Sequence, residues 1–185
     1  MHHILVALVE DKPGVLNRVA SMFRRRAFNI ESLAVGHTDQ PGISRMTIVI
    51  DSTQTNAERV IANLYKLVNV IDVQDVTLQP SVTRDLALIK VKVGPERRAE
   101  VNGLAQIFRA RIVDVAAEAV IVEVTGTEDK IEGMIELLRP LGIVEMVRTG
   151  QVSMTRGVTD GVRRVPGVNG HRQFEDLEEL AEMAP

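Results

Sequence analysis

The spacing of hydrophobic residues divides the first half of the chain into strand-like and helix-like segments. Residues 4–9 are a continuous apolar run of strand length, and a break at Asp11–Gly14 follows it. Apolar residues then recur with helical spacing over 15–23, which predicts a helix with one buried face. Asn56 can cap a second helix. The remaining segments of this half are strands at 28–35, 46–50 and 70–78 and a helical stripe of Val60, Ile61, Leu64, Leu67 and Val68.

The second half repeats this order of elements. Its segments are strands at 86–93, 111–115, 119–124 and 143–147 and helices that begin at Gly94–Pro95 and Thr127. Strand–helix–strand–strand–helix–strand is the order of the ferredoxin-like fold. We therefore predict an α+β protein made of two ferredoxin-like βαββαβ sandwiches.

This repetition also sets the expected domain boundaries. We place one domain at 1–79 and a second at 80–155, joined near Gln79–Ser81. The tail at 156–185 is first rich in glycine and arginine and then acidic. We expect it to be a flexible segment with a short acidic helix, which is either loose or docked on a partner.

The first strand is apolar on both of its faces. Helices cover only one face of a ferredoxin-like sheet, so the other face needs a second copy or another domain as a cover. Edge strands of small sheets also favour pairing between sheets. We therefore predict a homodimer.

Composition excludes several classes of protein. The chain has 185 residues, a net charge of −3, no Cys, no Trp, one Tyr and four Phe. A nucleic-acid binder is usually basic and carries aromatic residues for stacking, so we expect no nucleic-acid partner. No apolar run approaches the roughly 18 residues that a membrane helix needs, and the N-terminus lacks a signal-peptide pattern. We expect no membrane association and a cytoplasmic location.

The sequence shows no catalytic motif and no metal-ligand pattern. A histidine at position 3 can bind Cu or Ni together with a free amino terminus, but chance placement explains His3 better. His37 is best explained as a solvated loop histidine near Asp39. We therefore predict that the chain has no catalytic residues and holds no metal or cofactor of its own.

The segment Glu10–Leu16 carries the strongest chemical signal. A helix start leaves free N–H groups at the positive end of the helix dipole, and Gly14 lets a carboxylate approach the backbone. Asp11 can pair with an ammonium group, and the amide of Asn29 can contact both groups of an α-amino acid, from the same chain or its dimer mate. The structural alternative is a helix entry capped by Asp11, with Pro13–Gly14 as a turn and Asn29 bonded to its own backbone.

Longer segments of the sequence resemble a known family more specifically than the short loop does. Asp11-Lys12-Pro13-Gly14-Val15-Leu16 before an amphipathic helix resembles an ACT domain, a small amino-acid-sensing module. Three further segments resemble the small regulatory subunit of acetolactate (acetohydroxyacid) synthase. They are residues 28–35 with Thr38-Asp39 and 44–48, residues 84–91 and residues 108–115. The likeness covers roughly residues 1 to 155 and does not extend to the tail.

The resemblance implies an effector site at a dimer interface between ACT domains. It places this site on Asp11, Gly14 and Asn29, with Pro13 in the same loop. Its ligand would be valine or a related branched-chain amino acid. Three apolar residues lie near enough in sequence to contact the branched side chain: Val15, Leu16 and Ile30. The alternative is that they only form part of the hydrophobic core. Many members of the family carry Asn where this chain has Asp11, and the added charge would repel the effector's carboxylate.

The resemblance also implies a partner. The family activates a separate large catalytic subunit, which holds thiamine diphosphate, FAD and magnesium, and confers feedback inhibition on it. An exposed Arg45 is our candidate anchor for this partner. Two alternatives remain open. One is a free-standing ACT sensor that acts on another enzyme or a transcription regulator, and the other is an RNA-binding module with the same order of elements.

Overall fold

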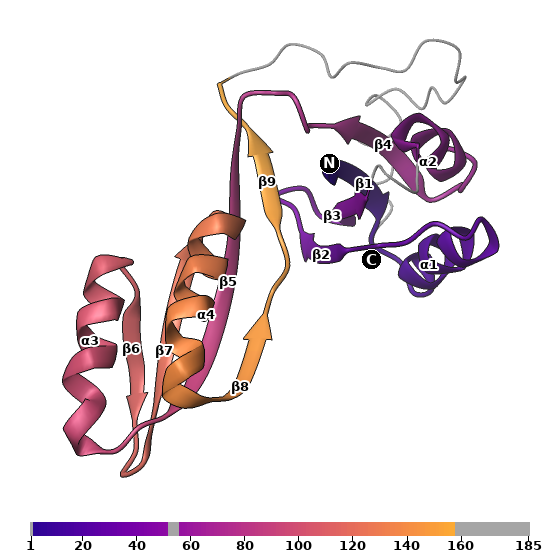
Figure 1. The fold of residues 1–185 in the computed structure, drawn as a ribbon. Helices are drawn as coiled ribbons and strands as arrows, with labels where there is room; N and C mark the ends of the chain where they lie inside the picture. Colours follow the sequence, from indigo (N-terminus) through magenta and orange to yellow (C-terminus); the bar gives the residue numbers. More distant parts are fainter. Residues whose placement is uncertain (1, 52–55, 158–185) are drawn as a thin grey trace. The chain divides into compact units, whose positions relative to one another are not determined.

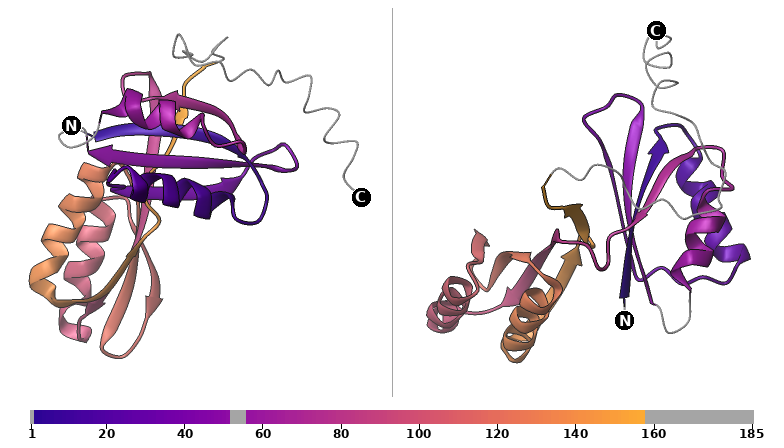
Figure 2. Two further views of the ribbon diagram at one scale, coloured as in Figure 1. Left: turned by 90° about the vertical axis from the view of Figure 1, so that its right-hand side faces the viewer. Right: turned by 90° about the horizontal axis from the view of Figure 1, so that it is seen from above.

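The first unit is a four-stranded antiparallel sheet with two helices on one face. The computed structural model describes residues 2–51 and 56–157. The strands lie in the order β2-β3-β1-β4, and both helices lie on the same side of the sheet (Figures 1 and 2). The elements are β1 (His2–Glu10), α1 (Val15–Arg25), β2 (Ser32–His37), β3 (Ile43–Asp51), α2 (Ala57–Leu64) and β4 (Val70–Asp75).

Alternation along the two central strands builds the core under the helices. Leu5 pairs with Ile48 and Ala7 pairs with Met46, and these side chains are all buried on the helix side. The predicted stripe of α1 packs against them. Each fully buried large aliphatic side chain on this face contributes roughly 1.5–3 kcal/mol to the stability of the unit. The buried residues of α1 are Val15, Val19, Met22 and Phe23.

The other face of the central strands is also buried. Val6 is 0% exposed, Thr47 2% and Val49 3%, although none of them belongs to the core under the helices. The predicted homodimer stays a prediction.

The end of α1 explains why β2 is shorter than the sequence suggested. Ala27 adopts φ 54°, and the N–H of Phe28 donates to the carbonyl of Phe23 at 3.0 Å, so the chain closes the helix before it extends. The rings of Phe23 and Phe28 meet edge to face at 6.1 Å. The predicted strand at 28–35 is thus wrong at its start, because β2 begins at Ser32.

The predicted cap of α2 is confirmed. The side chain of Asn56 accepts a hydrogen bond from the N–H of Arg59 at 3.1 Å. Thr127 stands at the N-cap position of α4, but its side chain makes no capping hydrogen bond. At the third helix, Pro95 opens a short 3-10 turn before the α-helix begins.

The second half forms a second sheet with the same strand order. The order is β6-β7-β5-β8, and β9 pairs with β5 outside this path. The two predicted ferredoxin-like sandwiches are therefore confirmed. The elements are β5 (Ser81–Lys92), α3 (Arg98–Ile107), β6 (Arg111–Val115), β7 (Ala119–Gly126), α4 (Glu128–Gly142), β8 (Ile143–Arg148) and β9 (Val152–Thr155).

The chain divides into two compact units. The second comprises Thr83–Val152, and the first comprises the described residues up to Val82 together with those from Ser153 on. This division lies close to the expected boundary at 79/80. The end of the expected second domain, at 153–155, groups instead with the first unit. Most of the expected tail, 158–185, lies outside the described residues.

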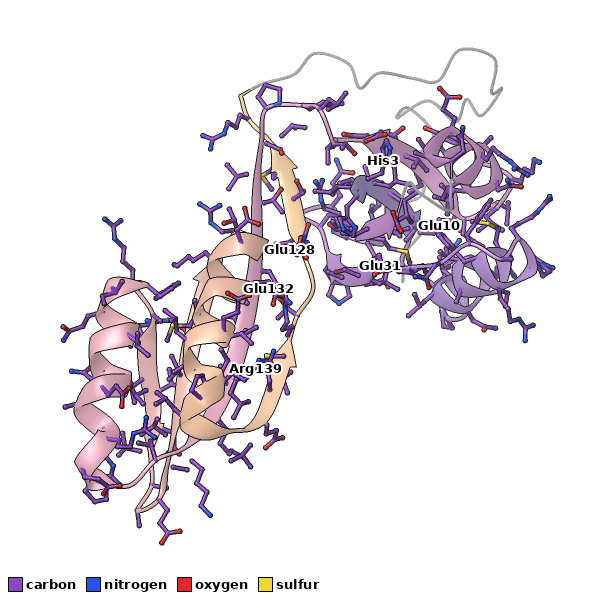
Figure 3. The ribbon with its side chains drawn as sticks, viewed as in Figure 1. His3, Glu10, Glu31, Glu128, Glu132 and Arg139 are labelled. Atoms are coloured by element: carbon purple, nitrogen blue, oxygen red, sulfur yellow. The ribbon has the colours of Figure 1, made fainter. Side chains whose placement is uncertain are left out.

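A buried ion pair ties β5 to β8 in the second unit. The Asp85 side chain is only 2% exposed and accepts hydrogen bonds from Nε and Nη2 of Arg148 at 2.8 and 2.6 Å. Arg148 also donates to Glu132 on α4, a residue that is labelled in Figure 3. Burial by itself lowers the pKa of Arg148, but Asp85 and Glu132 outweigh it, so this pKa is raised.

Candidate functional site

The loop between β1 and α1 presents an uncapped helix start. Gly14 is the N-cap residue, with φ 85° and ψ −5°, and the first turn of α1 holds no acidic residue and receives no side-chain cap. A Cβ added at Gly14 would meet no heavy atom of the described residues within 4 Å. The positive end of the helix dipole thus adjoins open space, which suits a carboxylate. Because no side chain caps α1, Asp11 does not have the capping role that the structural alternative gave it.

Asp11 is held in place by the neighbouring hairpin. Its N–H donates to the carbonyl of Gly42 at 2.7 Å, and its Oδ2 lies 3.1 Å from Nδ1 of His37. Its side chain remains 43% exposed. Asp11 therefore offers a fixed, accessible carboxylate beside the helix start. The sequence predicts His37 as a solvated loop histidine near Asp39, because nothing in the sequence shows that the end of β2 lies beside this loop.

A second polar cluster supports the base of the loop. The Glu10 side chain is only 15% exposed, lies 3.4 Å from Nζ of Lys12 and accepts a hydrogen bond from the Asn69 side chain. The N–H of Glu10 donates to the carbonyl of Asn69, and the amide oxygen of Asn69 accepts from Arg18 on α1. Asn69 and Glu10 are 59 positions apart, so sequence reasoning could not find this cluster.

The apolar residues expected near the site differ in how accessible they are. The Val15 side chain is 5% exposed and belongs to the core under the helices, so a ligand at the loop would meet its backbone. Ile30 is half-buried and packs against the same core. Leu16, in the first turn of α1, is 46% exposed, and Pro13 is also exposed.

Asn29 lies at the opposite end of the sheet from the loop. It precedes β2, whose first residue, Ser32, pairs with Val49 and through it faces Ile4 of β1. The loop follows the other end of β1, beyond Val9. Five strand positions at about 3.3 Å each separate these ends by about 17 Å. Within one chain, then, Asn29 does not meet Asp11 or Gly14.

Asn29 is exposed, and its immediate partner is local. Its side-chain amide donates to Oε1 of Glu31 at 2.7 Å. A ligand that uses both the loop and Asn29 must therefore take them from two copies of the chain.

Arg45 is less accessible than the sequence suggested. It lies on β3, is half-buried, and donates from Nη2 to the backbone carbonyl of Ser153 at 2.6 Å. This burial lowers the pKa of its guanidinium below the ordinary value. Its predicted contact with a partner stays a prediction, and it would have to use the donors that Ser153 leaves free.

The described part of the chain contains neither a candidate metal cluster nor a candidate membrane-spanning helix. Within residues 2–51 and 56–157, no group of three or more His, Asp or Glu side chains could hold a metal ion. None of the helices described there is both long and apolar enough to cross a membrane.

Comparison with known proteins assigns each half of the chain. Residues 5–72 match the family model described as an AHAS small subunit-like ACT domain, where AHAS is acetohydroxyacid synthase. Residues 84–157 match the model described as the small subunit of acetolactate synthase. The βαββαβ fold of the first unit and its glycine loop thus define an ACT domain, the class of small regulatory module.

Individual relatives complete the assignment. The chain is 53% identical over 157 residues to the probable acetolactate synthase small subunit of Archaeoglobus fulgidus, covering 85% of this chain and 98% of that protein. It is 49% identical over 155 residues to the acetolactate synthase small subunit of Mycobacterium leprae, covering 84% of this chain and 92% of that protein. The crystal structure of the Thermotoga maritima small subunit matches with a TM-score of 0.79 and 39% identity, covering 86% and 99%. The chain belongs to the family of acetolactate synthase small subunits.

Proposed function

We propose that the chain is the regulatory subunit of an acetolactate synthase, which activates a separate catalytic subunit and inhibits it when valine is abundant. Membership of the small-subunit family carries this proposal, because the matches extend over both units of the chain. The thiamine diphosphate, FAD and magnesium of the reaction would then belong to the catalytic subunit. This chain would contribute binding and regulation.

The chemistry of the β1–α1 loop supports an α-amino acid as the effector. The uncapped start of α1 and the open space at Gly14 suit its carboxylate. The exposed carboxylate of Asp11 suits its ammonium group. Leu16 offers an exposed apolar contact for a branched side chain. Valine, leucine and isoleucine all have these features, and valine is the effector that we propose.

The strand order supports a site shared by two copies. β2 is an edge strand, so it can pair with β2 of a second copy and extend the sheet. In a two-fold, antiparallel pairing, the start of one β2 lies beside the end of the other. That arrangement brings Asn29 of one copy toward His37 and the loop of its partner. Pairing through β4, the other edge, leaves Asn29 two strands farther away.

Linkage between sites provides the mechanism. If valine binds one arrangement of the dimer better than another, it shifts the dimer toward that arrangement, and the catalytic subunit responds. A coupling free energy of about 1–3 kcal/mol changes the affinity at one site roughly five- to 150-fold when the other site is occupied. Arg45 is our proposed contact with the catalytic subunit. Charge reversal at this position should weaken activation and leave the dimer intact.

Reconstitution tests the proposal. The purified chain is mixed with the thiamine-dependent large subunit from the same source, and acetolactate formation from pyruvate is measured with and without L-valine. We expect the chain alone to be inactive, the mixture to exceed the large subunit alone, and valine to remove the excess. An unchanged rate on mixing would contradict the regulatory assignment, whereas activation without a valine effect would contradict only the effector.

A further inference from the structure

Asp11, which we assign to the ammonium group of the effector, already has a neighbour that can carry positive charge. Its Oδ2 lies 3.1 Å from Nδ1 of His37, the last residue of β2. The His37 side chain is 83% exposed, so little besides Asp11 restrains the imidazole. An incoming ammonium group would meet a carboxylate that is already paired.

The backbone holds both residues of this pair in position. His37 pairs with Ser44 on β3. In the turn that follows, Oγ1 of Thr38 donates to the carbonyl of Ile43 at 3.0 Å and accepts the N–H of Gln40 at 3.1 Å. The same turn supplies the Gly42 carbonyl that accepts from the N–H of Asp11. The contact therefore follows from the hairpin, and only the two side chains have to separate to break it.

The charged groups around the pair have other partners or lie farther off. Lys12 pairs with Glu10, and Arg18 donates to the amide of Asn69. Asp39 belongs to the same turn as His37, but its carboxylate makes no ion pair with His37 within 4.0 Å in the described residues. Of the described residues, Asp11 is the ionisable group within ion-pair distance of His37. A change of charge on His37 acts first on Asp11.

We propose that His37 tunes the affinity of the effector site, because it competes with the ammonium group of the amino acid for Asp11. The inference rests on the proposed function, because it needs an α-amino acid at this loop. A protonated imidazole neutralises Asp11 and repels an ammonium group, whereas a neutral imidazole leaves the carboxylate charge for the effector. Because the pair is exposed, the competition changes affinity by roughly two- to fivefold.

Calorimetric titration of L-valine into the full-length chain tests this competition. The proteins are the wild type, His37→Ala, Asp11→Asn and the double variant, each at about pH 6 and about pH 8, which bracket the range where histidine side chains ordinarily change charge. We expect wild-type affinity to fall roughly two- to fivefold from pH 8 to pH 6. His37→Ala should bind valine equally well at both pH values. In the Asp11→Asn background, removing His37 should have a smaller effect than in the wild-type background.

A second histidine–aspartate pair provides the matched control. Nδ1 of His3 lies 3.0 Å from Oδ2 of Asp75 at the far end of β1, so His3→Ala removes a similar contact away from the loop. We expect His3→Ala to keep the pH dependence of the wild type. Unchanged or weaker binding by His37→Ala at pH 6, or an equal effect of His3→Ala, would overturn the inference alone. Absence of valine binding by the wild type at both pH values would overturn the proposed function as well.

Discussion

Gly14 combines a backbone requirement with a chemical one. Its φ of 85° lies in the left-handed region, where a side chain is strained, and the space next to its Cα is open. A side chain at this position would therefore strain the loop and fill the volume that we assign to the effector. The same residue serves the fold and the proposed site.

We predict that Gly14→Ala lowers the free energy of unfolding by about 1 kcal/mol and weakens valine binding at least tenfold. Chemical denaturation and calorimetric titration measure the two effects. Gly36→Ala is the control for stability, because a Cβ there also meets no described atom within 4 Å but the φ of Gly36 is not positive. Equal stability changes in the two variants would show that an alanine side chain is not strained at the φ angle of Gly14.

The sequence predicted the types of residue at the site but not the contacts between them. The types and spacing of Asp11, Gly14 and Asn29 indicated the chemistry of a zwitterion, and the structure leaves Asp11 and Asn29 exposed. The contact of Asp11 with His37 could not be predicted, because it depends on how the β2–β3 turn folds back on the loop. The partial burial of Arg45 and its hydrogen bond to Ser153 could not be predicted either, since 108 positions separate the two residues.

Among the secondary-structure elements, β2 is the one on which the proposed dimer depends. It lies at the edge of its sheet, and Val35 on this strand is 46% exposed. An exposed apolar side chain on an edge strand favours pairing with another strand. Hydrophobic periodicity predicted this strand but placed its start too early, because a positive φ at Ala27 does not show in an apolar pattern.

We predict that Val35→Lys weakens self-association at least about tenfold. In the proposed dimer both copies carry this side chain on the strands that pair, burial of each contributes roughly 1.5 kcal/mol, and lysine blocks pairing of edge strands. Sedimentation equilibrium measures the dimer dissociation constant. Val68→Lys is the control, since Val68 is 64% exposed and lies outside the strands. A Val35→Lys variant that dimerises like the wild type would exclude the β2 edge as the interface.

Considered as a whole, the chain carries two units with separate cores. The proposed effector residues all lie in the first unit, and the buried Asp85–Arg148 pair lies in the second. The repeated order of elements allowed both folds to be predicted from periodicity alone. The strand β9 was not predicted. Its four residues are too few for a clear hydrophobic pattern, and they form a strand by pairing with β5.

We predict that Asp85→Ala destabilises the second unit by about 3 kcal/mol, because it leaves the Arg148 guanidinium without its buried partner. Valine affinity should stay within twofold of the wild type, since the effector residues belong to the other unit. Hydrogen exchange resolved by residue separates the two units. Faster exchange throughout the first unit would contradict this independence.

A mixed dimer tests most directly the claim that two copies share each effector site. Asp11→Ala and Asn29→Ala chains are co-expressed with different tags, purified through both tags and titrated with L-valine. Each variant alone lacks one charged or polar contact at every site, which should weaken binding about tenfold or more. The mixed dimer regains one intact site, with the loop from one chain and Asn29 from the other. We expect one valine per mixed dimer at wild-type affinity; binding as weak as in either parent would contradict a shared site.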